Sequence, residues 1–149
     1  MILLSRRALL AIAAVVDIAI HARPTPVAAK ALAARHRLPP RHLETLLQAL
    51  VKANILKGVR GPRGGYELAR ERRRITIGEI TRVAITAEDL EADQQPGSKL
   101  LSDVVAPLVS DASRELMAAL DQATVEDLCR QADQKQVFGQ VRTTVDFTI

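Results

Sequence analysis

The sequence has very few aromatic residues and a single cysteine. Aromatic residues make up 2% of its 149 residues, with no Trp, one Tyr and two Phe. A hydrophobic core therefore has to be built from Leu, Ile, Val and Ala, which favours closely packed helices. Cys129 alone forms no internal disulfide and supplies too few ligands for a zinc or iron–sulfur site. We therefore expect no metal site, no cofactor and a reducing, cytoplasmic compartment.

The chain also lacks an apolar run long enough to span a bilayer. Residues 5–10, with two consecutive arginines, look like the start of a twin-arginine export signal. Asp17, however, interrupts the apolar stretch that follows, and Ile20-His21-Ala22 is a poor cleavage site. We expect instead one structural helix over about residues 5–22, and no membrane partner.

Charge is divided unevenly along the chain. Residues 1–74 carry 15 Lys/Arg and 4 Asp/Glu, a net charge of +11, whereas residues 75–149 carry 6 and 13, a net charge of −7. Together they give the formal net charge of +4. The basic half is typical of a module that binds a polyanion, although an ordinary solvated surface gives the same count.

Two short helices are predicted next in the chain. Pro24 and Pro26 end the first helix, and a second helix is expected over 27–36. Pro40 suits the first helical position before a third helix over 41–54. Two short helices joined by a tight turn have the form of a helix-turn-helix.

The third predicted helix has one apolar and one polar face. Leucines recur on one side, and the opposite side carries Arg41, Glu44, Thr45, Gln48 and Lys52. In a helix-turn-helix this is the face that enters the major groove. We expect Arg41 to read guanine, Gln48 adenine and Glu44 a cytosine amino group. Every amphipathic helix has such a face, so this helix alone does not identify DNA as the ligand.

A glycine-rich hairpin follows the third helix. Strands are expected over 55–60 and 66–69, joined by the loop Gly61-Pro62-Arg63-Gly64-Gly65. The glycines permit close approach of the backbone, and Arg60 and Arg63 suit the negative potential of a narrow minor groove. We therefore interpret the hairpin as a wing. Arg70 and the three arginines at 72–74 are expected to contact phosphate or to stay solvated.

Two more helices are predicted from capping signals. Thr76 and Glu79 form a capping box before a fourth helix over 77–86, and Thr124 with Asp127 starts a short final helix. Cys129 falls on the apolar face of that final helix, where a buried thiol is favoured over a redox-active one. The tail from residue 136 shows partial alternation, which leaves a strand and a frayed extension both open.

A long helix of about 20 residues is predicted between the fourth helix and the final helix. It carries an apolar stripe made of Leu101, Val105, Leu108, Ala112, Leu116 and Ala119. Pro107 is expected in the first turn, after a cap at Ser102 or Asp103. Because a chain of this size has little else to cover the stripe, we favour packing against a second copy over packing within the chain.

Three segments together resemble the Rrf2 family of bacterial regulators. They are 59–66 (VRGPRGGY), 41–44 (RHLE) and 17–21 (DIAIH), and the likeness covers roughly residues 2–85. The resemblance implies a homodimeric winged helix-turn-helix transcription factor that binds a palindromic operator. Carried over by position, the candidate DNA-binding residues are Arg6, Arg7, Pro40, Arg41, His42, Glu44, Thr45, Gln48, Arg60, Gly61, Pro62, Arg63, Gly64 and Gly65.

The chain departs from the family pattern at several positions. His42 stands where the family usually has Tyr, Leu10 replaces a common aromatic residue, and Pro39 replaces the usual serine cap. Many relatives hold an iron–sulfur cluster through three closely spaced cysteines, and the corresponding segment here, 86–103, contains none. A conventional cluster of that kind is therefore not expected.

The sequence thus predicts a mainly α fold with a small β-hairpin wing. The expected organisation is a winged helix-turn-helix domain (1–86), a linker (87–100), a dimerisation helix with a short terminal helix (101–135) and a tail (136–149). The favoured function is a homodimeric, sequence-specific DNA-binding regulator that acts as a repressor, with an effector that the sequence does not identify. The alternative is a winged-helix adaptor that binds another protein. No grouping of residues supports an enzyme.

Overall fold

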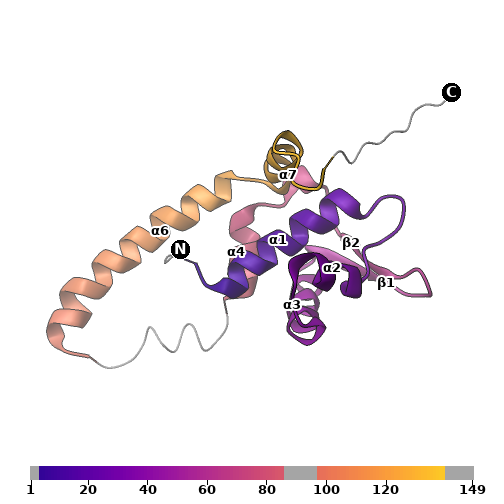
Figure 1. The fold of residues 1–149 in the computed structure, drawn as a ribbon. Coiled ribbons are helices and arrows are strands. Elements are labelled where there is room, and N and C mark those ends of the chain that lie inside the picture. Colours follow the sequence, from indigo (N-terminus) through magenta and orange to yellow (C-terminus); the bar gives the residue numbers. More distant parts are fainter. Residues whose placement is uncertain (1–3, 86–96, 140–149) are drawn as a thin grey trace.

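The computed structural model describes residues 4–85 and 97–139 (Figure 1). The described elements are α1 (Arg6–His21), α2 (Ala29–His36), α3 (Pro40–Lys52), β1 (Leu56–Val59), β2 (Gly65–Leu68), the 3-10 turn η1 (Arg72–Arg74), α4 (Ile77–Ala84), the π-helical turn η2 (Leu101–Val105), α6 (Ala106–Gln122) and α7 (Val125–Gln134). The strands pair antiparallel, with Leu56 opposite Leu68 and Val59 opposite Gly65. The predicted fold class, mainly α with one hairpin, is confirmed.

Side-chain caps set the starts of three helices where the sequence predicted them. Ser5 Oγ accepts a hydrogen bond from the backbone N–H of Ala8 at 3.1 Å and begins α1. A reciprocal capping box begins α4 at Thr76, and a second one begins α7 at Thr124. These caps confirm the three predicted starts to within a residue.

The second helix is shorter than predicted. Val27 is not helical, because its backbone N–H and C=O both pair with Tyr66 of β2, at 2.9 and 2.8 Å. The residue therefore forms a bridge on the edge of the hairpin, and α2 begins only at Ala29. The prediction of a helix from residue 27 was wrong because a long-range backbone pairing competes with the local helical preference.

The core is centred on the buried face of α1, which is built largely from alanine, with Val15 and Ile18. Leucines of α3 and isoleucines of α4 belong to the same cluster of buried residues. Val125 and Cys129 of α7 also belong to it, with Cys129 6% exposed. Cys129 is therefore buried, as expected, and this burial raises the pKa of its thiol.

The junction between α6 and α7 is fixed to the rest of the core through its backbone. The N–H of Val125 donates to the carbonyl of Ile75, and the N–H of Ile77 donates to the carbonyl of Ala123, both at 2.9 Å. Arg82 of α4 binds Asp121 of α6 with two hydrogen bonds, at 2.7 and 2.8 Å. The C-terminal end of α6 is thereby anchored, whereas its N-terminal end extends away from the other helices (Figure 1).

The long helix begins earlier than predicted. Ser98 Oγ accepts a hydrogen bond from the N–H of Leu101 at 3.2 Å, so the cap lies at Ser98 and not at Ser102 or Asp103. Pro107 consequently lies inside a longer helical segment, directly after the π-helical turn η2. A wider turn is one way in which a helix accommodates a residue without an N–H. Pro107 thus lies in the first turn of α6, as predicted, but the predicted cap at Ser102 or Asp103 was wrong.

Parts of two predicted segments lie outside the described residues. These are 87–96 of the linker and 140–149 of the tail. The first tail residues, up to Phe138, form a turn that continues from α7. Among the helices that the structure describes, none is long and apolar enough to cross a membrane.

Two glycines of the hairpin loop are required by packing inside the protein. A Cβ on Gly65 would lie 2.3 Å from the carbonyl oxygen of Val27, and a Cβ on Gly64 would lie 2.2 Å from the carbonyl oxygen of Val59. Gly61, in contrast, has open space around it and a φ of +117°, a conformation that favours glycine. The loop glycines therefore serve two purposes, close backbone packing and the turn at the tip.

We predict that Gly65→Ala lowers the free energy of unfolding by ~1–3 kcal/mol, because the added methyl group overlaps the Val27 backbone that pairs with β2. Gly58→Ala is the matched control, since Gly58 lies in the adjacent strand and a Cβ added there would have nothing within 4 Å. Chemical denaturation of both variants measures the difference. Equal stability of the two variants would contradict the packing role of Gly65.

Candidate nucleic-acid interface

Helix α3 presents the polar face that the sequence predicted. Leu43, Leu46, Leu47 and Leu50 are buried. The exposed residues of the helix include Pro40, Arg41, His42, Glu44, Thr45, Gln48 and Lys52. Arg37, in the left-handed conformation at φ 53°, ends α2 and turns the chain toward α3. The two helices thus have the arrangement of a helix-turn-helix, in which α3 occupies the position expected of a reading helix.

The hairpin projects beyond the body of the protein, on the side that also carries α2 and α3 (Figure 1). At its tip Arg60, Gly61, Pro62 and Arg63 are exposed, while Gly64 is half-buried. The N–H of Gly64 donates to the carbonyl of Gly61 at 3.0 Å and closes the turn. The two arginines therefore stand on a rigid, narrow tip, the shape that fits a minor groove.

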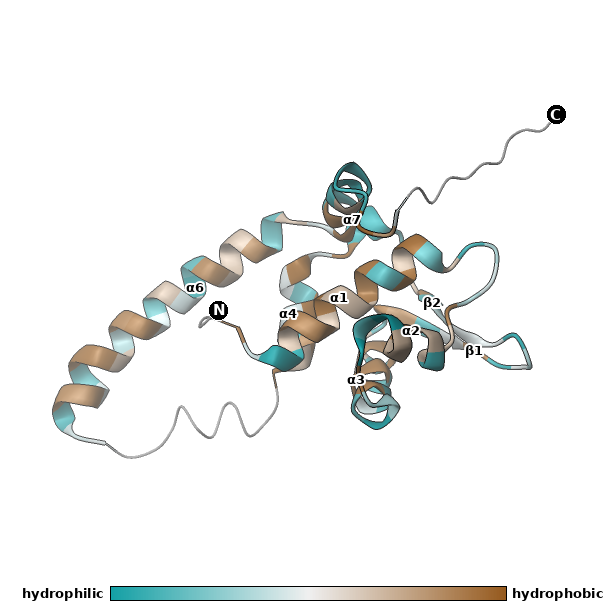
Figure 2. Ribbon diagram, viewed as in Figure 1, coloured by the Kyte–Doolittle hydropathy of each residue, from teal (hydrophilic) through white to brown (hydrophobic). Residues whose placement is uncertain are grey.

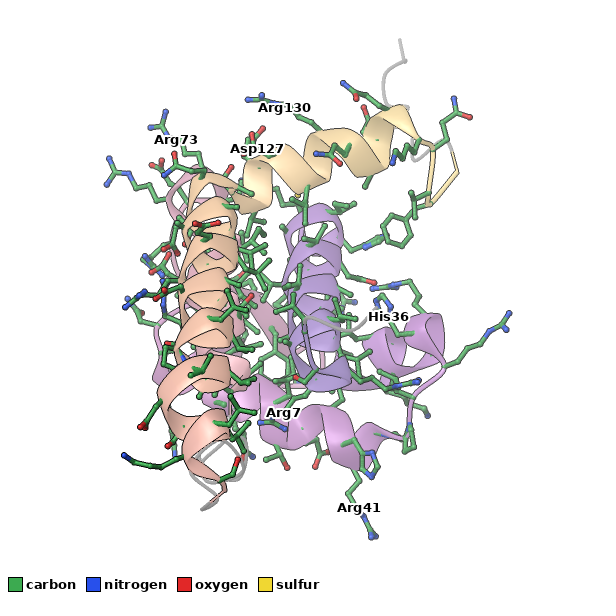
Figure 3. All side chains as sticks on the ribbon, turned by 90° about the vertical axis from the view of Figure 1, so that its left-hand side faces the viewer. Arg7, His36, Arg41, Arg73, Asp127 and Arg130 are labelled. Carbon is green, nitrogen blue, oxygen red and sulfur yellow. The ribbon has the colours of Figure 1, made fainter. Side chains whose placement is uncertain are left out.

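Two further arginines that the sequence analysis predicted as DNA contacts lie at the start of α1. Arg6 is exposed and Arg7 is half-buried. Arg7 lies in the lower part of the molecule in Figure 3, the part that also carries Arg41. Its Nε is buried and has no hydrogen-bond partner among the described residues.

Cations differ in their pairing between the two ends of the molecule. On α3 and the wing, no carboxylate of the described residues lies within 4.0 Å of Arg41, Lys52, Arg60 or Arg63. At the far end, four arginines are paired, in Arg72–Glu126, Arg73–Glu71, Arg82–Asp121 and Arg130–Glu126, whereas Lys135 has no carboxylate within 4.0 Å among the described residues; on the hairpin, Lys57 pairs with Glu67. Positive charge is therefore uncompensated where the reading helix and the wing lie.

This placement also limits the role of the arginines that follow the hairpin. Arg73 lies at the opposite end of the molecule from Arg41 in Figure 3. Arg70 binds Glu79 at 3.0 Å, and Arg72 of η1 binds Glu126 of α7. These arginines were expected either to contact DNA phosphate or to stay solvated. Contact with phosphates close to Arg41 does not fit this geometry.

A buried carboxylate behind the helix-turn-helix escaped the sequence analysis. Asp17 of α1 is 1% exposed. Arg35 donates to its two oxygens from Nε at 2.9 Å and from Nη2 at 2.7 Å, and His36 Nε2 lies 2.9 Å from Oδ2. His21 Nδ1 lies 3.0 Å from both Oδ1 and the Asp17 carbonyl, two acceptors, so this nitrogen donates. We call these four residues the Asp17 cluster.

The Asp17 cluster fastens the end of α2 to the middle of α1. The spacing of Asp17 and His21, one helical turn, is visible in the sequence, but Arg35 and His36 come from another helix. Burial raises the pKa of Asp17, but the hydrogen bonds and charge of Arg35, with further contributions from His36 and His21, lower it more, so the net pKa is below its ordinary value of 3.8. Because α3 follows directly after α2, the cluster fixes where the reading helix stands.

The fold and the surface define a winged helix-turn-helix DNA-binding protein, and comparison with known proteins agrees. A family model described as "Rrf2: Iron-dependent Transcriptional regulator" matches residues 4–131. The chain belongs to this Rrf2 family of transcriptional regulators, as its motifs indicated. The family consists of regulators and not of enzymes.

Individual relatives are similar over most of their length. The regulator IscR of Vibrio atlanticus is 30% identical over 80% of this chain and 70% of its own. CymR of Bacillus subtilis is 33% identical over 74% of this chain and 78% of its own. The solved structure of T. potens IscR superposes with a TM-score of 0.71 at 30% identity, covering 89% of this chain and 90% of that one.

The residues present do not fit an iron–sulfur cluster ligated by three cysteines. The whole sequence contains one cysteine, and Cys129 is buried in the core with its thiol pKa raised by that burial. No group of three or more His, Cys, Asp or Glu residues that could hold a metal ion occurs in the part of the chain that the structure describes. We therefore derive no function through such a cluster.

We predict that Asp17→Asn lowers the free energy of unfolding at neutral pH by about 3 kcal/mol, because Arg35 loses its buried counter-ion. The sign of the pH dependence follows from the lowered pKa: the ionised carboxylate stabilises the fold above pH 4, and this contribution is lost as pH falls through the folded-state pKa. As pH is lowered below 4, the free energy of unfolding should therefore fall less steeply for the variant than for the wild type. Asp111→Asn, which removes an exposed ion pair with Arg114, is the control and should change stability by less than about 1 kcal/mol. If the free energy of unfolding falls equally steeply with decreasing pH in Asp17→Asn and in the wild type, Asp17 is not the carboxylate that gives this pH dependence.

Proposed function

We propose that the protein is a homodimeric, sequence-specific repressor that binds a palindromic operator without an iron–sulfur cluster. The observation that carries the proposal is the uncompensated positive charge on α3 and the wing, set against paired cations at the far end. Phosphate supplies the missing negative charge, and exposed polar side chains of α3 supply base contacts. Repression follows from occupancy, because a dimer that covers promoter DNA excludes other proteins from it.

The proposed dimer rests on the long helix. The predicted stripe runs along α6 and the turn before it, and Leu101 and Leu108 are 45% and 70% exposed. Leu100, Val104, Val105 and Val109 are exposed as well. Figure 2 shows hydrophobic residues along the part of this long helix that extends away from the other helices. A hydrophobic surface of this kind is unfavourable in water, and a second copy is the partner that also supplies the second half of a palindromic site.

The reading of DNA is tested by three alanine variants and one control. We predict that Arg41→Ala relaxes preference at particular operator positions, with a loss of ~1–3 kcal/mol for a bidentate base contact. Arg60→Ala should weaken binding and alter the preference for a narrow, A·T-rich minor groove. Lys52 is farther from the start of α3, so Lys52→Ala should weaken binding to all DNA sequences by a similar factor. It should also lower the slope of log affinity against log salt concentration by about one unit.

Arg73→Ala is the matched control, since it removes the same charge at the opposite end of the molecule. Its binding should equal that of the wild type. The measurement is a competition of each variant for randomised duplexes at fixed salt. A uniform loss of binding in Arg41→Ala, with base preferences intact, would show that α3 is not the reading helix.

We predict that Leu108→Asp yields a folded monomer that binds DNA weakly. Leu108 is 70% exposed in the single chain, so the change leaves the fold intact, but it buries an unpaired charge in the proposed interface. Ser110→Asp places the same charge on the opposite side of α6 and should leave the dimer unchanged. Light scattering measures the mass of both variants. A dimer in the Leu108→Asp variant would rule out this interface.

A further inference from the structure

A half-open cavity of about 250 Å³ lies between the end of α1, the turn η1 and the helix α7. It is away from the proposed DNA surface, near the end of the molecule where Figure 3 labels Arg130. Its lining includes Ile20, Arg72, Arg130, Ala132, Asp133 and Phe138. A cavity of this size is smaller than those that hold drug-sized ligands and suits a small metabolite.

The charges around the cavity are incompletely balanced. Arg72 Nε lies 2.5 Å from one oxygen of Glu126, and Arg130 Nε lies 3.6 Å from the other. Two guanidinium groups therefore share a single carboxylate. Asp133, one helical turn beyond Arg130, has no cation within 4.0 Å in the described part of the chain. The cavity thus offers two guanidinium groups that share one carboxylate, and a second carboxylate, Asp133, that lies apart from them.

We propose that this cavity binds an α-amino acid with an apolar side chain. Its carboxylate would pair with Arg72 and Arg130, its ammonium group with Asp133, and its side chain would pack against Ile20 and Phe138. A purely anionic ligand would pair with the arginines but would place its negative charge near Asp133. A simple amine would pair with Asp133 but not with the arginines. The zwitterion is the small ligand that matches both charges and the apolar wall.

One wall of the cavity is in contact with the Asp17 cluster. The rings of Phe138 and His21 have centroids 4.6 Å apart and stand nearly perpendicular, at 84°. His21 donates to Asp17, whose carboxylate holds Arg35 at the end of α2. A ligand that shifts Phe138 therefore acts on the contacts that fix α2, and through α2 on α3. This coupling, which rests on the proposed function, makes the amino acid an effector of DNA binding.

Binding is tested by calorimetric titration of the full chain, without DNA, with L-leucine, L-valine, L-methionine and L-phenylalanine in turn. For the tightest of these, the corresponding amide and the corresponding deaminated acid are the matched probes. We expect saturable binding of the amino acid and at least about tenfold weaker binding of each derivative. Absence of binding by all four amino acids overturns the proposal, as does equal binding of the derivatives.

Variants locate the site. Arg130→Gln and Asp133→Asn should each weaken the amino acid at least about tenfold, whereas Arg73→Gln, outside the cavity, should bind as the wild type does. Unchanged binding in both cavity variants overturns the assignment of the site. Because these titrations contain no DNA, they succeed or fail independently of the proposed repressor function.

The coupling is tested by measuring operator affinity with and without the amino acid. His21→Asn removes the ring contact with Phe138 while leaving the cavity lining in place. We expect the wild type to change its operator affinity when the amino acid is added, and His21→Asn to bind the amino acid without that change. An equal response in both proteins overturns the route through His21, and no response in the wild type overturns the effector role.

Discussion

A carboxylate inside a hydrocarbon core is stable only when cations and hydrogen-bond donors surround it, and Asp17 imposes that requirement on this fold. Arg35, His36 and His21 meet it from two helices. The geometry leaves little freedom, because a displaced α2 would leave a charge buried without its partner. The same bonds that stabilise the protein therefore determine where the helix-turn-helix stands relative to α1.

The scarcity of aromatic residues explains how the remaining elements reach such close contact. Small side chains on α1 allow helices to approach, and glycines allow backbone to meet backbone. At Gly78 an added Cβ would lie 1.8 Å from Asp121 Oδ1, so the Asp121 side chain of α6 packs directly against the backbone of α4. Through Val125 and Cys129, α7 belongs to the same core as α1, although it follows the predicted dimerisation helix in the sequence.

Local signals were sufficient for most element starts but not for contacts between distant segments. Thr76 and Thr124 have their capping partner three residues away, so the motif is visible in the sequence. Arg35 lies 18 residues from Asp17, and no periodicity links them. Tyr66 similarly removes Val27 from α2 by a pairing across the fold. The polar residues of α3 could be predicted, because they lie on one face of one helix. The Asp17 cluster could not, because its residues come from two helices.

Members of this family are described as iron-dependent, and this chain has no set of thiolates with which to hold a cluster. The DNA-reading elements are nevertheless intact: α3 exposes its polar face, and the wing keeps its tip of two arginines. The effector proposed above would be a different input, and it would have to reach α2. The described contacts offer a continuous one, since Phe138 touches His21 and His21 is bonded to the carboxylate that holds Arg35. In the proposed mechanism the stabilising cluster and the route for a signal are the same set of bonds, so a ligand that disturbed α7 would change DNA affinity at the expense of stability.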